Sequence, residues 1–113
     1  MYRINQKNQK SSNMDQKEAI SKATDYKNLL KEHFHFTDIY LFGSYASNEF
    51  DSNSDIDIAV VVDKTDEDFF SITPKLWKLR REVDDRIEPI LVETDLDKSG
   101  FYEDIVKKGI RIN

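Results

Sequence analysis

The sequence has no cysteine and no apolar stretch long enough to cross a membrane or to serve as a signal peptide. The lack of cysteine excludes a disulfide framework and a thiolate zinc site. The lack of a long apolar stretch makes the cytoplasm the expected compartment. The chain also has no uninterrupted stripe of basic residues and carries a net charge of −5, which argues against a large nucleic-acid-binding surface.

The length of 113 residues allows one domain with a modest core and is too short for two. Residues 1–13 are polar and poor in apolar side chains, which is the composition of a flexible terminus. The sequence has no internal repeat. We therefore expect a flexible N-terminal tail over residues 1–13 and a single domain over residues 14–113.

A helix is predicted from Asp15 to about residues 32–34. Its apolar residues recur at spacings of four, three and four, which gives the helix one buried stripe with lysines and glutamates on its other faces. This stripe consists of Ala19, Ala23, Tyr26 and Leu30. His33 and His35 follow it without a third soft ligand, so we expect them to be surface residues rather than a metal site.

Two short apolar runs, 39–42 and 58–62, are rich in β-branched and aromatic residues and predict strands. The second run is apolar on both faces, which predicts a central strand. Asp55 and Asp57 stand at its start, and residues two apart in a strand point to the same face. Two such carboxylates repel each other unless a cation sits between them, and hard oxygen ligands suit magnesium.

The first run ends at Gly43-Ser44, where a short helix through residues 45–49 could start. Bare N–H groups at such a turn, with a serine hydroxyl, form a cradle for phosphate. A nucleoside triphosphate bridged by magnesium to Asp55 and Asp57 would fit at this edge of the sheet. Either motif alone is usually only a turn. Their combination at this spacing, with an acid on the following strand, favours the functional interpretation.

A helical segment is predicted after Asp63, with Thr65 and the acids at 66–68 suited to a capped N-terminus. Pro74 interrupts it. Either the helix kinks at Pro74, or Thr73 caps a second helix that begins there.

The inward stripe of this segment is expected to comprise Leu76, Trp77, Leu79 and Val83. Trp77 with Phe69 and Phe70 could also be a platform on which a base stacks. Aromatic residues at helical spacing more often belong to a core, so we expect core positions here.

The spacing of the turn and the acids resembles a known family. Gly43-Ser44, ten intervening residues and then Asp55-x-Asp57 resemble the signature of the DNA polymerase beta-like nucleotidyltransferases. The resemblance is strongest to their small stand-alone members, the minimal nucleotidyltransferases of bacteria and archaea. The family has a third carboxylate on the next strand, before an apolar pair or triplet, and Glu88 matches it. Relatives commonly carry Arg-Gly after the alanine of this loop, whereas this chain has Ser47-Asn48, a departure from the family pattern that puts one nucleotide contact of the family in doubt.

Asp84, Asp85 and Glu93 compete with Glu88 for the role of the third carboxylate. Asp85 should lie in a loop and Glu93 at the far end of the strand, so geometry prefers Glu88. If Asp57 and Glu88 both begin their strands and meet one metal, the two strands run parallel. Parallel strands require a long connection such as the predicted helical segment.

The first strand should then run antiparallel to the second. The expected fold is α/β (α+β), a small mixed β-sheet with packed helices of the polymerase beta palm-like nucleotidyltransferase type. Pro89 predicts an edge or a bulge in the third strand. A last helix is expected over 101–108, with Ser99 as its cap and Gly109 at its end, and residues 110–112 should add a short closing strand.

The resemblance implies transfer of a nucleoside monophosphate from a triphosphate to a hydroxyl, with release of pyrophosphate. Asp55, Asp57 and Glu88 would be the catalytic residues and the ligands of two Mg²⁺ ions, which clamp the entering and leaving oxygens. Gly43 and Ser44 would position the β- and γ-phosphates. ATP is the usual donor in the family.

The absence of a basic stripe makes a small or protein acceptor more plausible than a DNA template. The minimal nucleotidyltransferases are often paired with a HEPN-domain protein, a ribonuclease-like toxin, which they neutralise by complex formation or by adenylylating a tyrosine. An antitoxin adenylyltransferase is therefore expected. One alternative is a small-molecule nucleotidyltransferase of the aminoglycoside-modifying kind, working as a dimer. Another is a binding module that only sequesters its partner.

Overall fold

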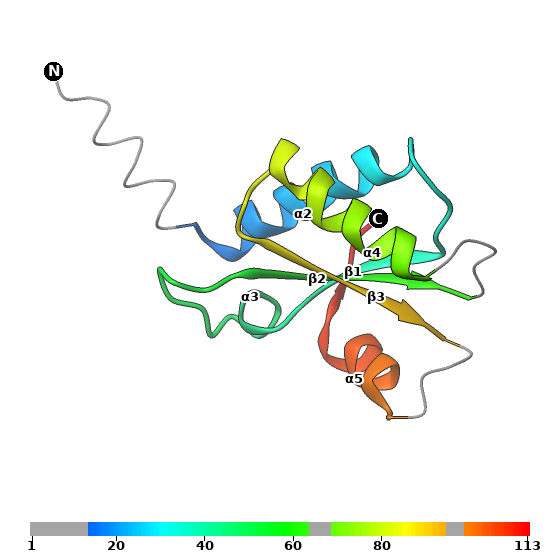
Figure 1. Cartoon of the computed structure of the whole chain (residues 1–113). Coiled ribbons are helices and arrows are strands. Elements are labelled where there is room, and N and C mark those ends of the chain that lie inside the picture. The colour runs from blue at the N-terminus through cyan, green and yellow to red at the C-terminus, as the bar shows by residue number, and fades with distance from the viewer. Residues whose placement is uncertain (1–13, 64–68, 95–98) are drawn as a thin grey trace, which may run out of the picture.

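The computed structural model describes residues 14–63, 69–94 and 99–113 (Figure 1). The elements follow in the order α2 (Gln16–Leu30), β1 (Asp38–Phe42), α3 (Ser44–Ser47), β2 (Ile56–Val62), α4 (Phe69–Leu79), η1 (Arg80–Glu82), β3 (Ile87–Glu93), α5 (Phe101–Lys108) and β4 (Ile110–Arg111). The predicted tail over residues 1–13 and the predicted cap at Thr65 with its acids lie outside the described residues.

The four strands form one mixed sheet in the order β3-β2-β1-β4. β2 pairs with β3 in parallel, whereas β1 is antiparallel to both β2 and β4. The predicted mixed sheet and the strand directions are therefore confirmed. Pro89 lies in β3, which is the edge strand on that side of the described sheet, as its missing N–H group predicts.

Helices cover the two faces of the sheet unequally. In Figure 1, α2 and α4 lie on one face and α5 lies on the other. Side chains of β2 alternate between the two cores: Ile58 and Val60 face the α2 and α4 side, whereas Ala59 and Val61 face α5. β2 is thus buried on both faces, as predicted, except at Asp57, which is partly exposed.

α2 begins one residue after the predicted start, with Asp15 as its N-cap, and ends at Leu30, slightly before the predicted end. The Asp15 carboxylate accepts a hydrogen bond from the backbone N–H of Glu18 at 2.8 Å, which caps the helix. The whole predicted stripe is buried, and the Tyr26 hydroxyl donates to the carbonyl of Leu76 at 2.7 Å, which joins α2 to α4. His33 and His35 are exposed, as expected.

The segment around Pro74 decides between two alternatives, and one prediction for it is wrong. A single helix, α4, runs through Pro74, so the alternative in which Thr73 caps a second helix does not occur. Trp77 is 40% exposed and does not belong to the core, whereas Leu76 and Leu79 are buried. Because each residue of a helix turns by about 100°, the residue after Leu76 points away from the face that Leu76 buries. The side chains of Phe69 and Phe70 lie outside the described part of the chain.

The C-terminal elements agree closely with the sequence pattern. α5 has the predicted bounds and ends at Gly109, although Gly100 occupies the N-cap position and the Ser99 hydroxyl accepts from the N–H of Phe101 at 3.2 Å. The closing strand is one residue shorter than predicted, and Ile112 is buried after it. No helix within the described residues has the length and apolar content that crossing a membrane would require.

Candidate active site

The turn after β1 lies directly against one of the predicted acids. Gly43 has a φ of 73° and a ψ of −151°, a region of backbone conformation that is accessible almost only to glycine. A Cβ atom added to Gly43 would overlap Oδ2 of Asp57 and lie 3.1 Å from its Cγ. The antiparallel register causes this contact, because it pairs Phe42, the residue before the turn, with Asp57.

The loop that departs from the family pattern keeps its shape by another means. Asn48 has a φ of 63° and is the one non-glycine residue with positive φ in the described ranges. Asparagine tolerates this left-handed conformation better than most residues, so it can stand where relatives have glycine. The Ser47 hydroxyl donates to the carbonyl of Ser44 at 3.3 Å, which links the last residue of the short helix α3 to its first.

The predicted acids come together at the start of β2 and β3. Asp57 stands opposite Glu88 in the parallel register, and neighbouring residues in register point to the same face of a sheet. Asp55 shares a side-chain hydrogen bond with Glu88. The register thus brings Asp55, Asp57 and Glu88 into one acidic cluster beside Gly43.

The charge of this acidic cluster alters its proton affinity. Burial, and then the negative charge of Asp55, raise the pKa of Asp57. Burial, the hydrogen bond to Asp55 and the charges of both aspartates raise the pKa of Glu88, and the positive charge of Arg80 opposes this rise. The raised pKa values of Asp57 and Glu88 result in part from repulsion between neighbouring ionised carboxylates, and a bound cation would relieve that repulsion.

The acidic cluster fits a divalent cation in chemistry, since carboxylate oxygens are the ligands that Mg²⁺ prefers and one or two of them suffice. Within 14–63, 69–94 and 99–113, no three His, Asp or Glu side chains already stand in the geometry of a metal-ligand group. The assignment of Asp55, Asp57 and Glu88 as three metal ligands therefore stays a prediction.

The three acids that compete with Glu88 for the role of the third carboxylate do not lie beside Asp57. Asp84 pairs with Nζ of Lys22 at 3.0 Å and with a guanidinium nitrogen of Arg86 at 3.1 Å. Burial opposes the ionisation of Asp84, but its hydrogen bonds to Arg86 and Lys22 outweigh that effect and lower its pKa to about 2. Asp85 is exposed in a turn, and Glu93 stands opposite Val62 at the far end of β3. Of these acids, only Glu88 neighbours Asp57.

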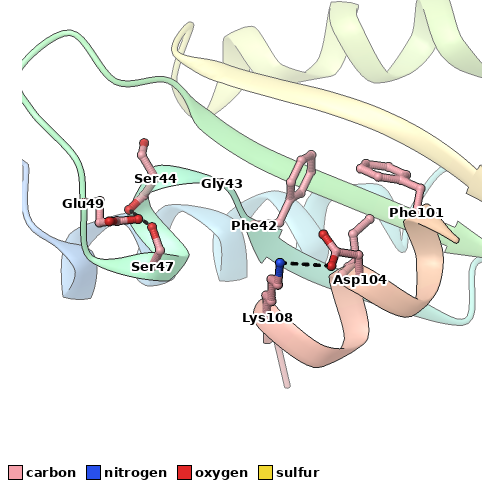
Figure 2. A pocket seen from close by; sticks show the side chains of 10 residues that line it. Phe42, Gly43, Ser44, Ser47, Glu49, Phe101, Asp104 and Lys108 are labelled. Carbon is pink, nitrogen blue, oxygen red and sulfur yellow. Dashed lines mark hydrogen bonds and ion pairs between the residues drawn. The ribbon is translucent and has the colours of Figure 1, made fainter.

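Two clefts meet beside the acidic cluster. The first, here called the turn cleft, has a volume of about 510 Å³ and lies between the Gly43-Ser44 turn and α5 (Figure 2). It is lined by Phe42, Gly43, Ser44, Ser47, Glu49, Phe101, Asp104, Ile105, Lys108 and Gly109. The second, here called the edge cleft, has a volume of about 570 Å³ and is lined by Phe42, Asp57, Thr73, Trp77, Glu88, Pro89, Ile90 and Leu91.

Trp77 is a cleft residue that the sequence interpretation assigned to the core. Its ring lies 4.7 Å from the guanidinium carbon of Arg80, an arrangement typical of cation–π contacts. The helical phase of α4 could have revealed this position, because Ile72, Leu76 and Leu79 already define one inward face.

Comparison with known proteins agrees with this geometry. The family described as "Polymerase beta, Nucleotidyltransferase" matches residues 24–113. None of the curated protein sequences compared with the chain matches it. A crystal structure of a candidate nucleotidyltransferase from Sulfolobus solfataricus is similar with a TM-score of 0.60 and 21% identity, over 85% of this chain and 80% of that one. At that identity, the similarity shows the fold alone.

Two toxin–antitoxin crystal structures are also similar. One, with AMP-PNP, has a TM-score of 0.61 and 29% identity, over 80% of this chain and 72% of that one. The other, MntA–HepT, has a TM-score of 0.56 and 26% identity, over 81% and 69% of the two chains. Since the family match spans most of the sequence and the fold agrees with it, the chain belongs to the polymerase beta nucleotidyltransferase family.

Proposed function

We propose that this nucleotidyltransferase transfers AMP from ATP to a hydroxyl of a partner toxin, in the presence of magnesium, and acts as an antitoxin. One observation carries the proposal. Asp57 lines the edge cleft and touches Gly43, which lines the turn cleft. A triphosphate in one cleft and an acceptor in the other would therefore meet at the same carboxylate.

Residues of the turn cleft bind the phosphates, and the acids beside the edge cleft bind the metal. Gly43 and Ser44 bind the β- and γ-phosphates and orient the triphosphate. Asp55, Asp57 and Glu88 hold magnesium, which supplies charge neutralisation at the transferred phosphoryl group when bound. The similar toxin–antitoxin structure with AMP-PNP supports an adenine nucleotide as the donor.

The transfer exchanges one bond to phosphorus for another. The acceptor oxygen forms a bond to the α-phosphorus, and the bond from that phosphorus to the oxygen bridging to the β-phosphate breaks. Pyrophosphate leaves with that electron pair. The proton of the acceptor hydroxyl passes to Glu88, the carboxylate that lines the edge cleft beside Asp57.

The edge cleft favours a protein acceptor over an aminoglycoside. Trp77 and Ile90 are large apolar side chains that remain 40% and 41% exposed, and both line the edge cleft together with Pro89 and the acids Asp57 and Glu88. Exposed apolar side chains grouped beside a site commonly mark a protein-binding surface. A polycationic sugar would instead need mostly acidic walls. A HEPN-domain toxin of the kind that pairs with minimal nucleotidyltransferases is the partner we propose.

The test is transfer of label from α-labelled ATP to a co-purified HEPN-domain partner in the presence of Mg²⁺. Wild-type protein should label the partner, and Asp57→Ala should not, while both keep the same circular dichroism spectrum. Full activity in Asp57→Ala would refute the assignment of the site. If wild-type protein binds Mg·ATP and the partner but transfers nothing, the chain is a binding module. Labelling of kanamycin rather than the partner would indicate a small-molecule enzyme.

A further inference from the structure

The turn cleft contains a cation that no sequence motif singled out. Its described lining residues include three charged side chains, and Lys108 is the positive one, facing Glu49 and Asp104 as the acids. Figure 2 shows Lys108 and Asp104 on α5, across the cleft from Ser44 and Glu49. An anionic triphosphate seated at the Gly43-Ser44 turn would be repelled by these two acids, and among the charged side chains of the described lining only Lys108 would attract it.

The C-terminal end of α5 is held firmly beside the turn. A Cβ atom on Gly109 would lie 3.0 Å from the carbonyl oxygen of Leu41 and 2.6 Å from that of Ile105, so the backbone there packs directly on the end of β1. Ile110 then pairs with Leu41 in the sheet. Lys108 precedes Gly109, and Leu41 comes two residues before Gly43. The position of the Lys108 backbone is therefore fixed relative to the turn.

The ion pair of Lys108 is easily exchanged for another. Its Nζ lies 3.3 Å from Oδ1 of Asp104, one helical turn earlier, and the two side chains are 77% and 58% exposed. Ion pairs between side chains in water are weak, because solvent screens the charges and holding two long side chains together costs entropy. A triphosphate presents several negatively charged oxygens to one ammonium group, whereas Asp104 presents a single exposed carboxylate.

We propose that Lys108 is a nucleotide-binding residue, whose ammonium group leaves Asp104 and binds a β- or γ-phosphate oxygen of a nucleoside triphosphate held at Gly43-Ser44. This inference rests on the proposed function and adds a residue from α5 to the nucleotide site. Asp104 then competes with the triphosphate for the ammonium group of Lys108.

The neighbouring residue Lys107 offers a matched control, because it has the same charge on the same helical turn but does not line the turn cleft. Binding of Mg·ATP and of AMP to the full-length chain would be measured by calorimetry. Lys108→Ala should weaken Mg·ATP binding by about tenfold or more, as expected for loss of a charge-assisted hydrogen bond, whereas Lys107→Ala should change it less than about twofold. AMP affinity should be the same in both variants. Thermal unfolding of both variants would exclude a loss of α5.

Asp104→Asn provides an independent second test, because it releases Lys108 and removes one repelling charge, and it should tighten Mg·ATP binding. Equal Mg·ATP affinity in Lys108→Ala and Lys107→Ala would overturn the inference while leaving the proposed function intact. Equal losses of Mg·ATP and AMP affinity in Lys108→Ala would overturn it as well, because AMP lacks the β- and γ-phosphates. Failure of the wild-type chain to bind Mg·ATP would instead overturn both this inference and the proposed nucleotide site.

Discussion

Gly43 lies so close to Asp57 that a methyl group on the glycine would overlap a carboxylate oxygen of the aspartate. The pairing of Phe42 with Asp57 across β1 and β2 produces this contact. The proposed phosphate-binding turn and the proposed metal-binding acid therefore cannot move independently. A substitution at Gly43 should therefore displace the carboxylate of Asp57.

Replacement of Gly43 by alanine should disturb both stability and nucleotide binding. Gly100→Ala is the matched control, because Gly100 also has a positive φ, of 85°, but an added Cβ atom there would meet none of the described residues within 4 Å. Backbone strain alone should cost each variant about 1–3 kcal/mol in the free energy of unfolding. Only Gly43→Ala should also lose Mg·ATP binding. Urea denaturation would measure the free energy of unfolding of each variant, and calorimetry would measure its Mg·ATP affinity. Wild-type Mg·ATP affinity in Gly43→Ala would contradict a role for this turn.

Asp57 should destabilise the fold at neutral pH. Its pKa is raised in the folded state, so the folded chain takes up the proton more readily than the unfolded chain does. The free energy of unfolding contributed by Asp57 therefore falls as the pH rises from the ordinary carboxyl value of 3.8 through the raised pKa. Asp57→Asn should unfold at a higher temperature than wild type at pH 7, and this difference should vanish below that ordinary value.

The control for this comparison is Asp25→Asn, which neutralises an exposed aspartate of α2 and should leave the unfolding temperature unchanged. Mg²⁺ should stabilise the wild-type fold by mass action and should stabilise Asp57→Asn far less. Calorimetric melts across pH, with and without Mg²⁺, would measure both effects. A lower unfolding temperature for Asp57→Asn at pH 7 would show that burial of the charge is compensated elsewhere.

The fold could be predicted from the sequence where a local pattern carries the information. The stripe of α2 and the apolar runs of β1 and β2 depend on spacing within one element, and these predictions are confirmed. The prediction for Trp77 is wrong, because an aromatic residue next to Leu76 suggests burial unless the phase of the whole helix is compared. The Gly43 and Asp57 contact depends on the register between two strands, which spacing along the chain does not reveal.

Asp84 illustrates the same limit for charged residues. As a sequence position it competes with Glu88, and the folded structure distinguishes the two, because Lys22 from α2 pairs with Asp84 whereas Glu88 stands opposite Asp57. Its role is therefore structural, whereas Glu88 faces the edge cleft.

Replacement of Asp84 by alanine should lower stability without removing nucleotide binding. The carboxylate accepts a hydrogen bond from the backbone N–H of Arg86 at 2.8 Å, besides its two ion pairs, and the loss of this acceptor should cost about 1–3 kcal/mol. The pKa is lowered to about 2, so its stabilisation is complete above the ordinary value of 3.8 and is lost as the pH falls through about 2. Urea denaturation would measure this cost. Asp85→Ala, at an exposed neighbour, should be neutral, and equal effects of the two variants would contradict the assignment.

Trp77 should contribute to partner binding and little to the fold. Its ring lies over the guanidinium of Arg80, and loss of an exposed cation–π contact costs about 0.5–1 kcal/mol. Because Trp77 is 40% exposed and lies outside the core, Trp77→Ala should fold and bind Mg·ATP. Val106 is the control, because it is 45% exposed on α5 and lines neither cleft. Binding of a co-purified HEPN-domain partner, measured by calorimetry, should weaken by about 30-fold in Trp77→Ala, as for a tryptophan central to an interface, and should be unchanged in Val106→Ala. The chain has one tryptophan, so its fluorescence reports directly on the edge cleft, and an emission spectrum unmoved by the partner would place the interface elsewhere.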